Sequence, residues 1–184
     1  MNLPNTITIG RLLLVPLTVW LIISEAYGAA FAAFMVAGIS DGVDGYLARR
    51  LNQRSELGAH LDPVADKALL VSVYVTLGLA KDIPAWLVIM VVSRDLLIVG
   101  GMILAWVLGK PLGVKPLMIS KVNTAAQIVM AVLVLGAEAI HQDFGWLITA
   151  GSLLVGGLTL ASGAAYLLTW IRHMAGDSGE NSAS

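Results

Sequence analysis

The sequence predicts an all-α integral membrane protein with six transmembrane helices, from its composition and from the length of its apolar runs. Of its 184 residues, 58% are hydrophobic and 12% are charged, and the mean hydropathy is +0.84. Soluble domains are about 45–50% apolar, so this composition argues against a soluble fold. The net charge of -1 excludes a strongly basic nucleic-acid-binding protein, and the absence of cysteine excludes disulfides and thiolate metal sites.

Apolar runs between polar clusters place the helices, since a spanning helix needs about 20 residues. The expected spans are 7–24, 29–40, 62–79, 83–108, 120–139 and 144–171. The second run is short, but 41–51 contains no proline and can continue the same helix beyond the bilayer surface.

The two ends of the chain need separate interpretation. Residues 1–174 form one predicted domain, and 175–184 have the small, polar composition of a disordered tail. At the other end, 12–23 has the length of a signal-peptide core, and Ser24-Glu25-Ala26 loosely resembles a cleavage site. A signal peptide is therefore the alternative to a first span.

Basic residues predict the orientation, because Lys and Arg collect in cytoplasmic loops. When the spans alternate in direction, Lys81 falls on the side away from the N-terminus, together with several acids. The basic residues on the N-terminal side are Arg11, Arg49, Arg50, Arg54, Lys110, Lys115, Lys121 and Arg172. We therefore expect cytoplasmic termini, as in a protein of the bacterial inner membrane.

Two pairs of aspartates mark a candidate site. Asp41 and Asp44 share one helix face, and Asp62 and Asp66, four residues apart, share a face of the next helix. Pro63 marks either the first turn of that helix or a kink in a helix already begun. The spacing predicts that the four carboxylates converge at the cytoplasmic ends of two adjacent helices.

Four ionised carboxylates repel one another, and divalent cations relieve that repulsion. Oxygen ligands without His or Cys suit Mg²⁺, Mn²⁺ or Ca²⁺, and two metal ions about 3.5–4 Å apart are used to clamp phosphoryl groups. Small residues at Gly45 and Ala48 leave room for a ligand on this face, and Arg49 can reach a phosphate oxygen. The pattern favours a phosphate or diphosphate substrate, although any one of these aspartates alone would be read as a solvated or capping residue.

The run D-x2-D-G-x2-A-R-x8-G-x3-D-x3-D resembles the signature of the CDP-alcohol phosphatidyltransferase family at every fixed position. These positions are Asp41, Asp44, Gly45, Ala48, Arg49, Gly58, Asp62 and Asp66. The opening Asn2-Leu3-Pro4-Asn5, followed by Thr8, Arg11 and Pro16, is also similar to that of the family.

The resemblance implies six helices around a polar cavity open to the cytoplasmic face, in a homodimer. It implies that an acceptor hydroxyl attacks the CDP-linked phosphorus of CDP-diacylglycerol and that CMP leaves. The four aspartates would bind two Mg²⁺ or Mn²⁺ ions, with Asp66 as the general base. The residues implied at the CDP site are Asn5, Thr8, Gly45, Ala48, Arg49 and Gly58.

A second group of polar residues suggests an acceptor site. Arg94 lies inside the fourth span, where an unpaired cation is costly and is functional by default. Asp95 points about 100° away from it, which favours a partner on another helix rather than Arg94. Lys121, Asn123 and Thr124 open the fifth span on the same side, so we expect a phosphate site facing the metals. The alternative is a structural role, either an Arg94–Asp ion pair or a snorkelling Lys121.

The acceptor can be narrowed by motif and charge. Ser93-Arg94-Asp95 and the Lys121-Val122-Asn123-Thr124 run resemble mitochondrial-type cardiolipin synthases, whereas glycerol-phosphate-using members usually carry Ala-Arg-Glu and Lys-x-Lys-Thr. A phosphodiester carries one negative charge and a phosphomonoester up to two, so Asn123 in place of the second Lys favours phosphatidylglycerol. Glycerol 3-phosphate is the next candidate, and inositol phosphate, serine and choline stay open. A divalent-cation transporter is the rival from another class, but its acids would lie near the midplane between repeats.

Overall fold

The structure is a computed structural model that describes the backbone of residues 3–51, 56–107 and 118–180, with side chains at 10, 12–40, 67–101 and 118–171. These ranges contain six α-helices and no strand, which confirms the predicted all-helical fold. The helices are α1 (Leu3–Ile23), α2 (Tyr27–Leu51), α3 (Glu56–Ala80), α4 (Ala85–Val107), α5 (Met118–Ala139) and α6 (Gly145–Glu180).

Helix bounds differ from the predicted spans where the chain turns polar. α2 continues to Leu51 as expected. α3 begins at Glu56 rather than at 62, so Pro63 lies within a helix already begun. α6 reaches Glu180, beyond the predicted start of the tail at 175. Extending an existing helix costs far less than nucleating one, so polar residues at its ends can join it without any apolar pattern.

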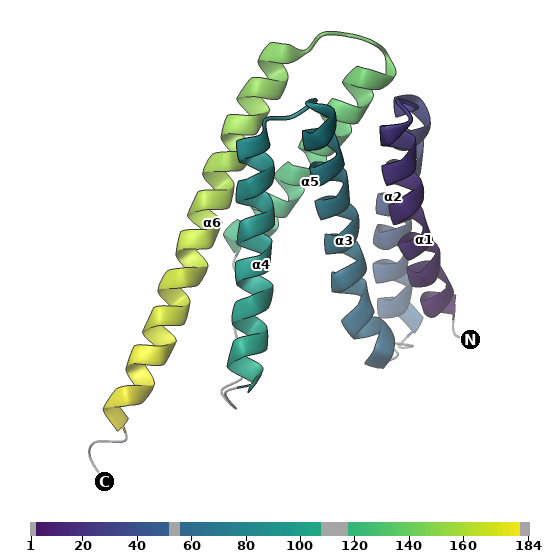
Figure 1. The fold of residues 1–184 in the computed structure, drawn as a ribbon. Helices are drawn as coiled ribbons and strands as arrows, with labels where there is room; N and C mark the ends of the chain where they lie inside the picture. The colour runs from purple at the N-terminus through teal and green to yellow at the C-terminus, as the bar shows by residue number, and fades with distance from the viewer. Residues whose placement is uncertain (1–2, 52–55, 108–117, 181–184) are drawn as a thin grey trace.

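The six helices alternate in direction, so that both termini lie at one end of the molecule (Figure 1). The α1–α2, α3–α4 and α5–α6 connections lie at the opposite end. α1 packs against α2 and α3, α4 packs against α3 and α6, and α5 contacts α2, α3 and α6. α5 therefore connects α2 and α3 on one side of the bundle with α6 on the other.

The same cap ends α1, α3 and α5. Glu25, Lys81 and His141 have φ angles of 56°, 70° and 52°, in the left-handed region. After α3, for example, Lys81 N donates to the Gly78 carbonyl at 3.2 Å and the next amide donates to the Leu77 carbonyl at 3.0 Å. This pair of hydrogen bonds is the Schellman motif, which satisfies the last carbonyls of a helix and ends it sharply.

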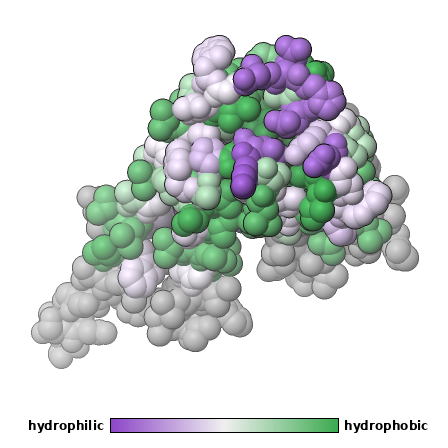
Figure 2. All heavy atoms as spheres, turned by 45° about the horizontal axis from the view of Figure 1, so that its top comes forward, coloured by the Kyte–Doolittle hydropathy of each residue, from purple (hydrophilic) through white to green (hydrophobic). Residues whose placement is uncertain are grey.

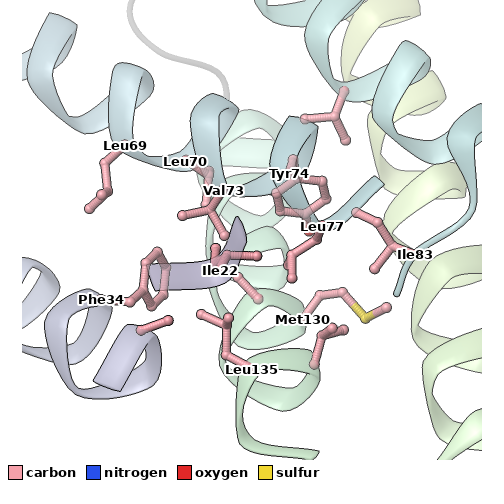
Figure 3. Packing of buried hydrophobic residues seen from close by; sticks show 14 of the residues in the cluster. Ile22, Phe34, Leu69, Leu70, Val73, Tyr74, Leu77, Ile83, Met130 and Leu135 are labelled. Atoms are coloured by element: carbon pink, nitrogen blue, oxygen red, sulfur yellow. The ribbon is translucent and has the colours of Figure 1, made fainter. Parts of the chain in front are cut away.

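The apolar core lies where α1, α2, α3 and α5 meet (Figure 3). Ile22 of α1 and Phe34 of α2 pack there with Tyr74 of α3 and Leu135 of α5, and all four are buried. α4 adds Leu87 and Val91, and α6 adds Val155. The core therefore holds together the helices that carry the predicted site.

The outer surface is apolar along the helices and polar at the connections. Leu13, Leu79, Leu97 and Trp146 are more than three-fifths exposed, and hydrophilic residues gather at the end that carries the three connections (Figure 2). By length and composition, α5 and residues Gly145–Ile171 are long and apolar enough to cross a membrane among the described residues. Six separate spans remain a prediction.

Candidate functional site

The four aspartates of the motif lie on two consecutive helices, Asp41 and Asp44 on α2 and Asp62 and Asp66 on α3. Asp41 lies ten residues before the end of α2, and Asp66 lies ten residues after the start of α3. At 1.5 Å per residue both are about 15 Å from the helix ends that residues 52–55 connect. Asp44 and Asp62, the inner members of the two pairs, lie seven and six residues from the same ends, so the two pairs are about equally far along their helices.

The side chains of this motif lie outside the described residues, so their convergence stays a prediction. The same holds for the predicted nucleotide ligands Asn5 and Thr8 on α1, Gly45, Ala48 and Arg49 on α2, and Gly58 on α3. Where side chains are described, no group of three or more His, Asp or Glu is arranged to hold a metal. Four carboxylates on two consecutive helices remain a donor set that suits Mg²⁺ or Mn²⁺.

Arg94 is the centre of the polar network that the structure describes. It is 4% exposed and lies in the middle of α4. Its Nη1 donates to Asp95 Oδ1 at 2.6 Å, and its Nη2 donates to Ser162 Oγ of α6 at 2.6 Å and to Ser120 Oγ of α5. The guanidinium also lies 5.9 Å from the centre of the Tyr166 ring. This cation is therefore held by α4, α5 and α6 together.

Asp95 links this cation to α3. Its Oδ2 lies 2.8 Å from Lys67 Nζ, while its Oδ1 accepts from Arg94. The predicted partner on another helix is therefore confirmed, but the expectation that Asp95 does not pair with Arg94 is wrong, because the long arginine side chain spans the angle between neighbouring positions. Two cations and one carboxylate leave a net charge of one positive in this group.

Lys67 also relates the network to the motif, since it directly follows Asp66 in α3. The Lys67–Asp95 ion pair therefore fixes α4 against the segment of α3 that carries the second pair of aspartates.

The predicted residues of α5 face different ways. Asn123 is fully buried, and its Oδ1 accepts from Thr159 Oγ1 of α6 at 3.0 Å. Thr124 Oγ1 donates to the carbonyl of Ser120 in its own helix at 3.1 Å. Lys121 is exposed, because positions two apart on a helix point about 160° away from each other. The structure thus brings Asn123 to the α5–α6 interface and leaves Lys121 on the outside.

Several contributors to the network were not among the predicted site residues. The sequence did not indicate Lys67, because it directly follows a motif residue and because its ion-pair partner depends on how α3 and α4 pack. On α6, Thr159, Ser162 and Tyr166 recur at helical spacing within an apolar run, and this polar stripe could have been recognised in the sequence.

The opposite end of the molecule carries a separate polar contact. Tyr27 donates its hydroxyl hydrogen to Asp82 Oδ2 at 2.9 Å, which ties α2 to the α3–α4 connection. Burial raises the pKa of Asp82 and the hydrogen bond from Tyr27 partly opposes that rise. Because the contact is at the far end from the motif, we assign it a structural role.

Comparison with known proteins shows which family the chain resembles. A model of the CDP-alcohol phosphatidyltransferase family matches residues 1–170. The chain is 36% identical to a CDP-diacylglycerol–glycerol-3-phosphate 3-phosphatidyltransferase of Pseudomonas fluorescens, over 96% of this chain and 94% of that protein.

Two eukaryotic relatives match over most of the chain. It is 37% identical to the chloroplastic CDP-diacylglycerol–glycerol-3-phosphate 3-phosphatidyltransferase 1 of Oryza sativa, over 90% of this chain and 56% of that protein. It is 35% identical to the CMP-forming cardiolipin synthase of Homo sapiens, over 81% of this chain and 57% of that protein. The chain therefore spans little more than half the length of these two relatives. The match to the family model covers nearly the whole chain, which belongs to the CDP-alcohol phosphatidyltransferase family.

Proposed function

We propose that this protein transfers a phosphatidyl group from CDP-diacylglycerol to an acceptor hydroxyl and releases CMP. The observation that carries this proposal is the complete aspartate motif on α2 and α3, at matched distances along the two helices. The family and the names of the relatives agree with it. They give no support to the rival interpretation of a cation transporter.

The motif residues have different roles in this reaction. Asp41, Asp44, Asp62 and Asp66 would hold two Mg²⁺ or Mn²⁺ ions, which supply charge neutralisation at the diphosphate when bound. Asp66 takes the proton of the acceptor hydroxyl. Asn5, Thr8, Gly45, Ala48, Arg49 and Gly58 form the CDP site. The site faces the cytoplasm, in a membrane-embedded homodimer.

Phosphatidylglycerol is the acceptor that the charges favour, which would make the protein a cardiolipin synthase. The Lys67–Asp95–Arg94 group carries one net positive charge, which balances the single negative charge of a phosphodiester. Glycerol 3-phosphate is the second candidate, because the Pseudomonas fluorescens relative that matches over 94% of its length is named for that acceptor.

The reaction is tested with purified protein, CDP-diacylglycerol and Mn²⁺ or Mg²⁺, with each acceptor supplied separately and the lipid product identified by mass. Asp66→Asn should abolish metal-dependent CMP release while the helical content stays unchanged. Asp82→Asn makes the same chemical change at the opposite end of the molecule and should leave CMP release intact. Undiminished release by Asp66→Asn would remove this residue from the mechanism.

The acceptor is tested by adding a cation at Asn123. Asn123→Lys should raise the use of glycerol 3-phosphate relative to phosphatidylglycerol by about tenfold, because one further charge-assisted contact matches the second phosphate charge. Asn123→Gln keeps a neutral amide and separates the effect of charge from the loss of Asn. An unchanged preference in the Lys variant would show that Asn123 does not discriminate between acceptors, and phosphatidylglycerophosphate as the sole wild-type product would overturn the cardiolipin assignment.

A further inference from the structure

A groove of about 850 Å³ lies between α4 and α6. Its walls are apolar, with Leu97 and Ile98 on α4 and Leu160 and Leu167 on α6. Its volume falls in the range of ligand pockets, about 300–1,000 Å³. Arg94 reaches this groove and is its charged residue among those that the structure describes.

Small residues on both walls create this space. A Cβ atom added at Gly100 or Gly101 of α4 would meet no heavy atom within 4 Å. On α6, a Cβ atom at Gly163 would only touch Arg94 Cγ at 3.8 Å, and Ala164 follows it along the same wall. The two helices therefore leave a channel open along their length, although they pack closely where Gly156 meets Trp86.

The length of the groove fits a hydrocarbon chain. On α4 its wall extends from Ile89 to Gly101, which is about 18 Å at 1.5 Å per residue. One leaflet of a bilayer core is about 15 Å thick, so the groove is about as long as the layer that a single acyl chain occupies.

The charge of the groove fits the headgroup of such a lipid. Arg94 Nε is buried and has no hydrogen-bond partner in the part of the chain that the structure describes. Arg94 belongs to the group with Lys67 and Asp95, which has one net positive charge. A phosphodiester would supply the balancing charge, and an acyl chain attached to it would lie against Leu97, Leu160 and Leu167.

We propose that the α4–α6 groove binds an acyl chain of the acceptor phospholipid, with its phosphodiester at Arg94. The inference rests on the proposed function and deepens it, because it defines the acceptor as a lipid that reaches the site between two helices. CDP-diacylglycerol also carries acyl chains, so the test below distinguishes the acceptor from the donor as the occupant of the groove.

The test fills the groove and follows lipid binding directly. Phosphatidylglycerol with a photoactivatable group on its acyl chain should label peptides of α4 and α6 in the purified protein, and excess unlabelled phosphatidylglycerol should compete. Gly101→Leu should reduce this labelling about tenfold, the effect expected when a side chain overpacks a binding site. Ala164→Leu, on the other wall, should do the same. Gly157→Leu is the matched control, since a Cβ atom there meets nothing within 4 Å and Gly157 does not line the groove.

Kinetics and competition distinguish the outcomes. Gly101→Leu should raise the KM for phosphatidylglycerol about tenfold and leave the KM for CDP-diacylglycerol unchanged. Unchanged labelling in both groove variants would overturn the proposal, as would competition by CDP-diacylglycerol but not by phosphatidylglycerol. If the labelling behaves as expected but phosphatidylglycerol yields no CMP, the groove binds this lipid and the assignment of phosphatidylglycerol as the acceptor is wrong.

Discussion

Asp95 is the residue on which the described polar network depends, because it is the anion shared by Arg94 and Lys67. Asp95→Asn keeps the shape of the side chain and removes the negative charge that the two cations share. Removing one member of a buried ion pair costs about 3–5 kcal/mol, so we expect the free energy of unfolding to fall by about 3 kcal/mol. Unfolding of the detergent-solubilised protein, followed by circular dichroism, measures this change. Glu25→Gln removes an exposed charge elsewhere and should have little effect, and equal stability of the two variants would contradict the prediction.

Individual residues were predictable from the sequence when their chemistry conflicted with their surroundings. Arg94 stands out as a cation within an apolar run, and it is buried as such a residue must be. Lys67 was not found, because its importance depends on which residue of α4 it meets. Lys121 was assigned with Asn123 from its position along the chain, but the helix turns it to the outside.

At the scale of the helix, the three left-handed caps are the feature most open to test. A non-glycine residue in this conformation costs about 1–2 kcal/mol, and glycine avoids that cost. Lys81→Gly should therefore raise the free energy of unfolding by about 0.5–1 kcal/mol, once the greater freedom of glycine in the unfolded chain is counted. Thermal unfolding in detergent measures the gain. Lys81→Ala loses the same charge without relieving the backbone, so an equal gain in both variants would refute the explanation.

The helices themselves were predictable because their residues are apolar both on the side that faces the membrane and on the side that faces the core. Each helix therefore forms one continuous apolar run in the sequence. The start of α3 and the end of α6 were not, because the residues there are polar and are helical by extension of an existing helix. The sequence did not predict the left-handed positions either, since Glu25, Lys81 and His141 are not the glycines that usually mark such a position.

For the whole molecule, the alternating helices predict which ends share a side of the membrane. The chain has no cysteine, so single cysteines can be introduced without background. Lys81→Cys lies in the α3–α4 connection, and Met118→Cys lies at the start of α5, which is the end of that helix away from the α5–α6 connection; both positions are exposed. In intact cells, a membrane-impermeant thiol reagent should label Lys81→Cys, whereas Met118→Cys should react only after the membrane is broken. The reverse pattern would place the active site on the other face.

α6 is considerably longer than the hydrocarbon core of a membrane is thick. Its 36 residues extend for about 54 Å, against a hydrocarbon core of about 30 Å. The apolar part ends at Ile171, so about 13 Å of rigid helix continues to Glu180. Because the same rod forms one wall of the groove, a small tilt there is amplified at its far tip. A spectroscopic probe at residue 180 would therefore report any tilt of α6 with a larger displacement than a probe within the groove.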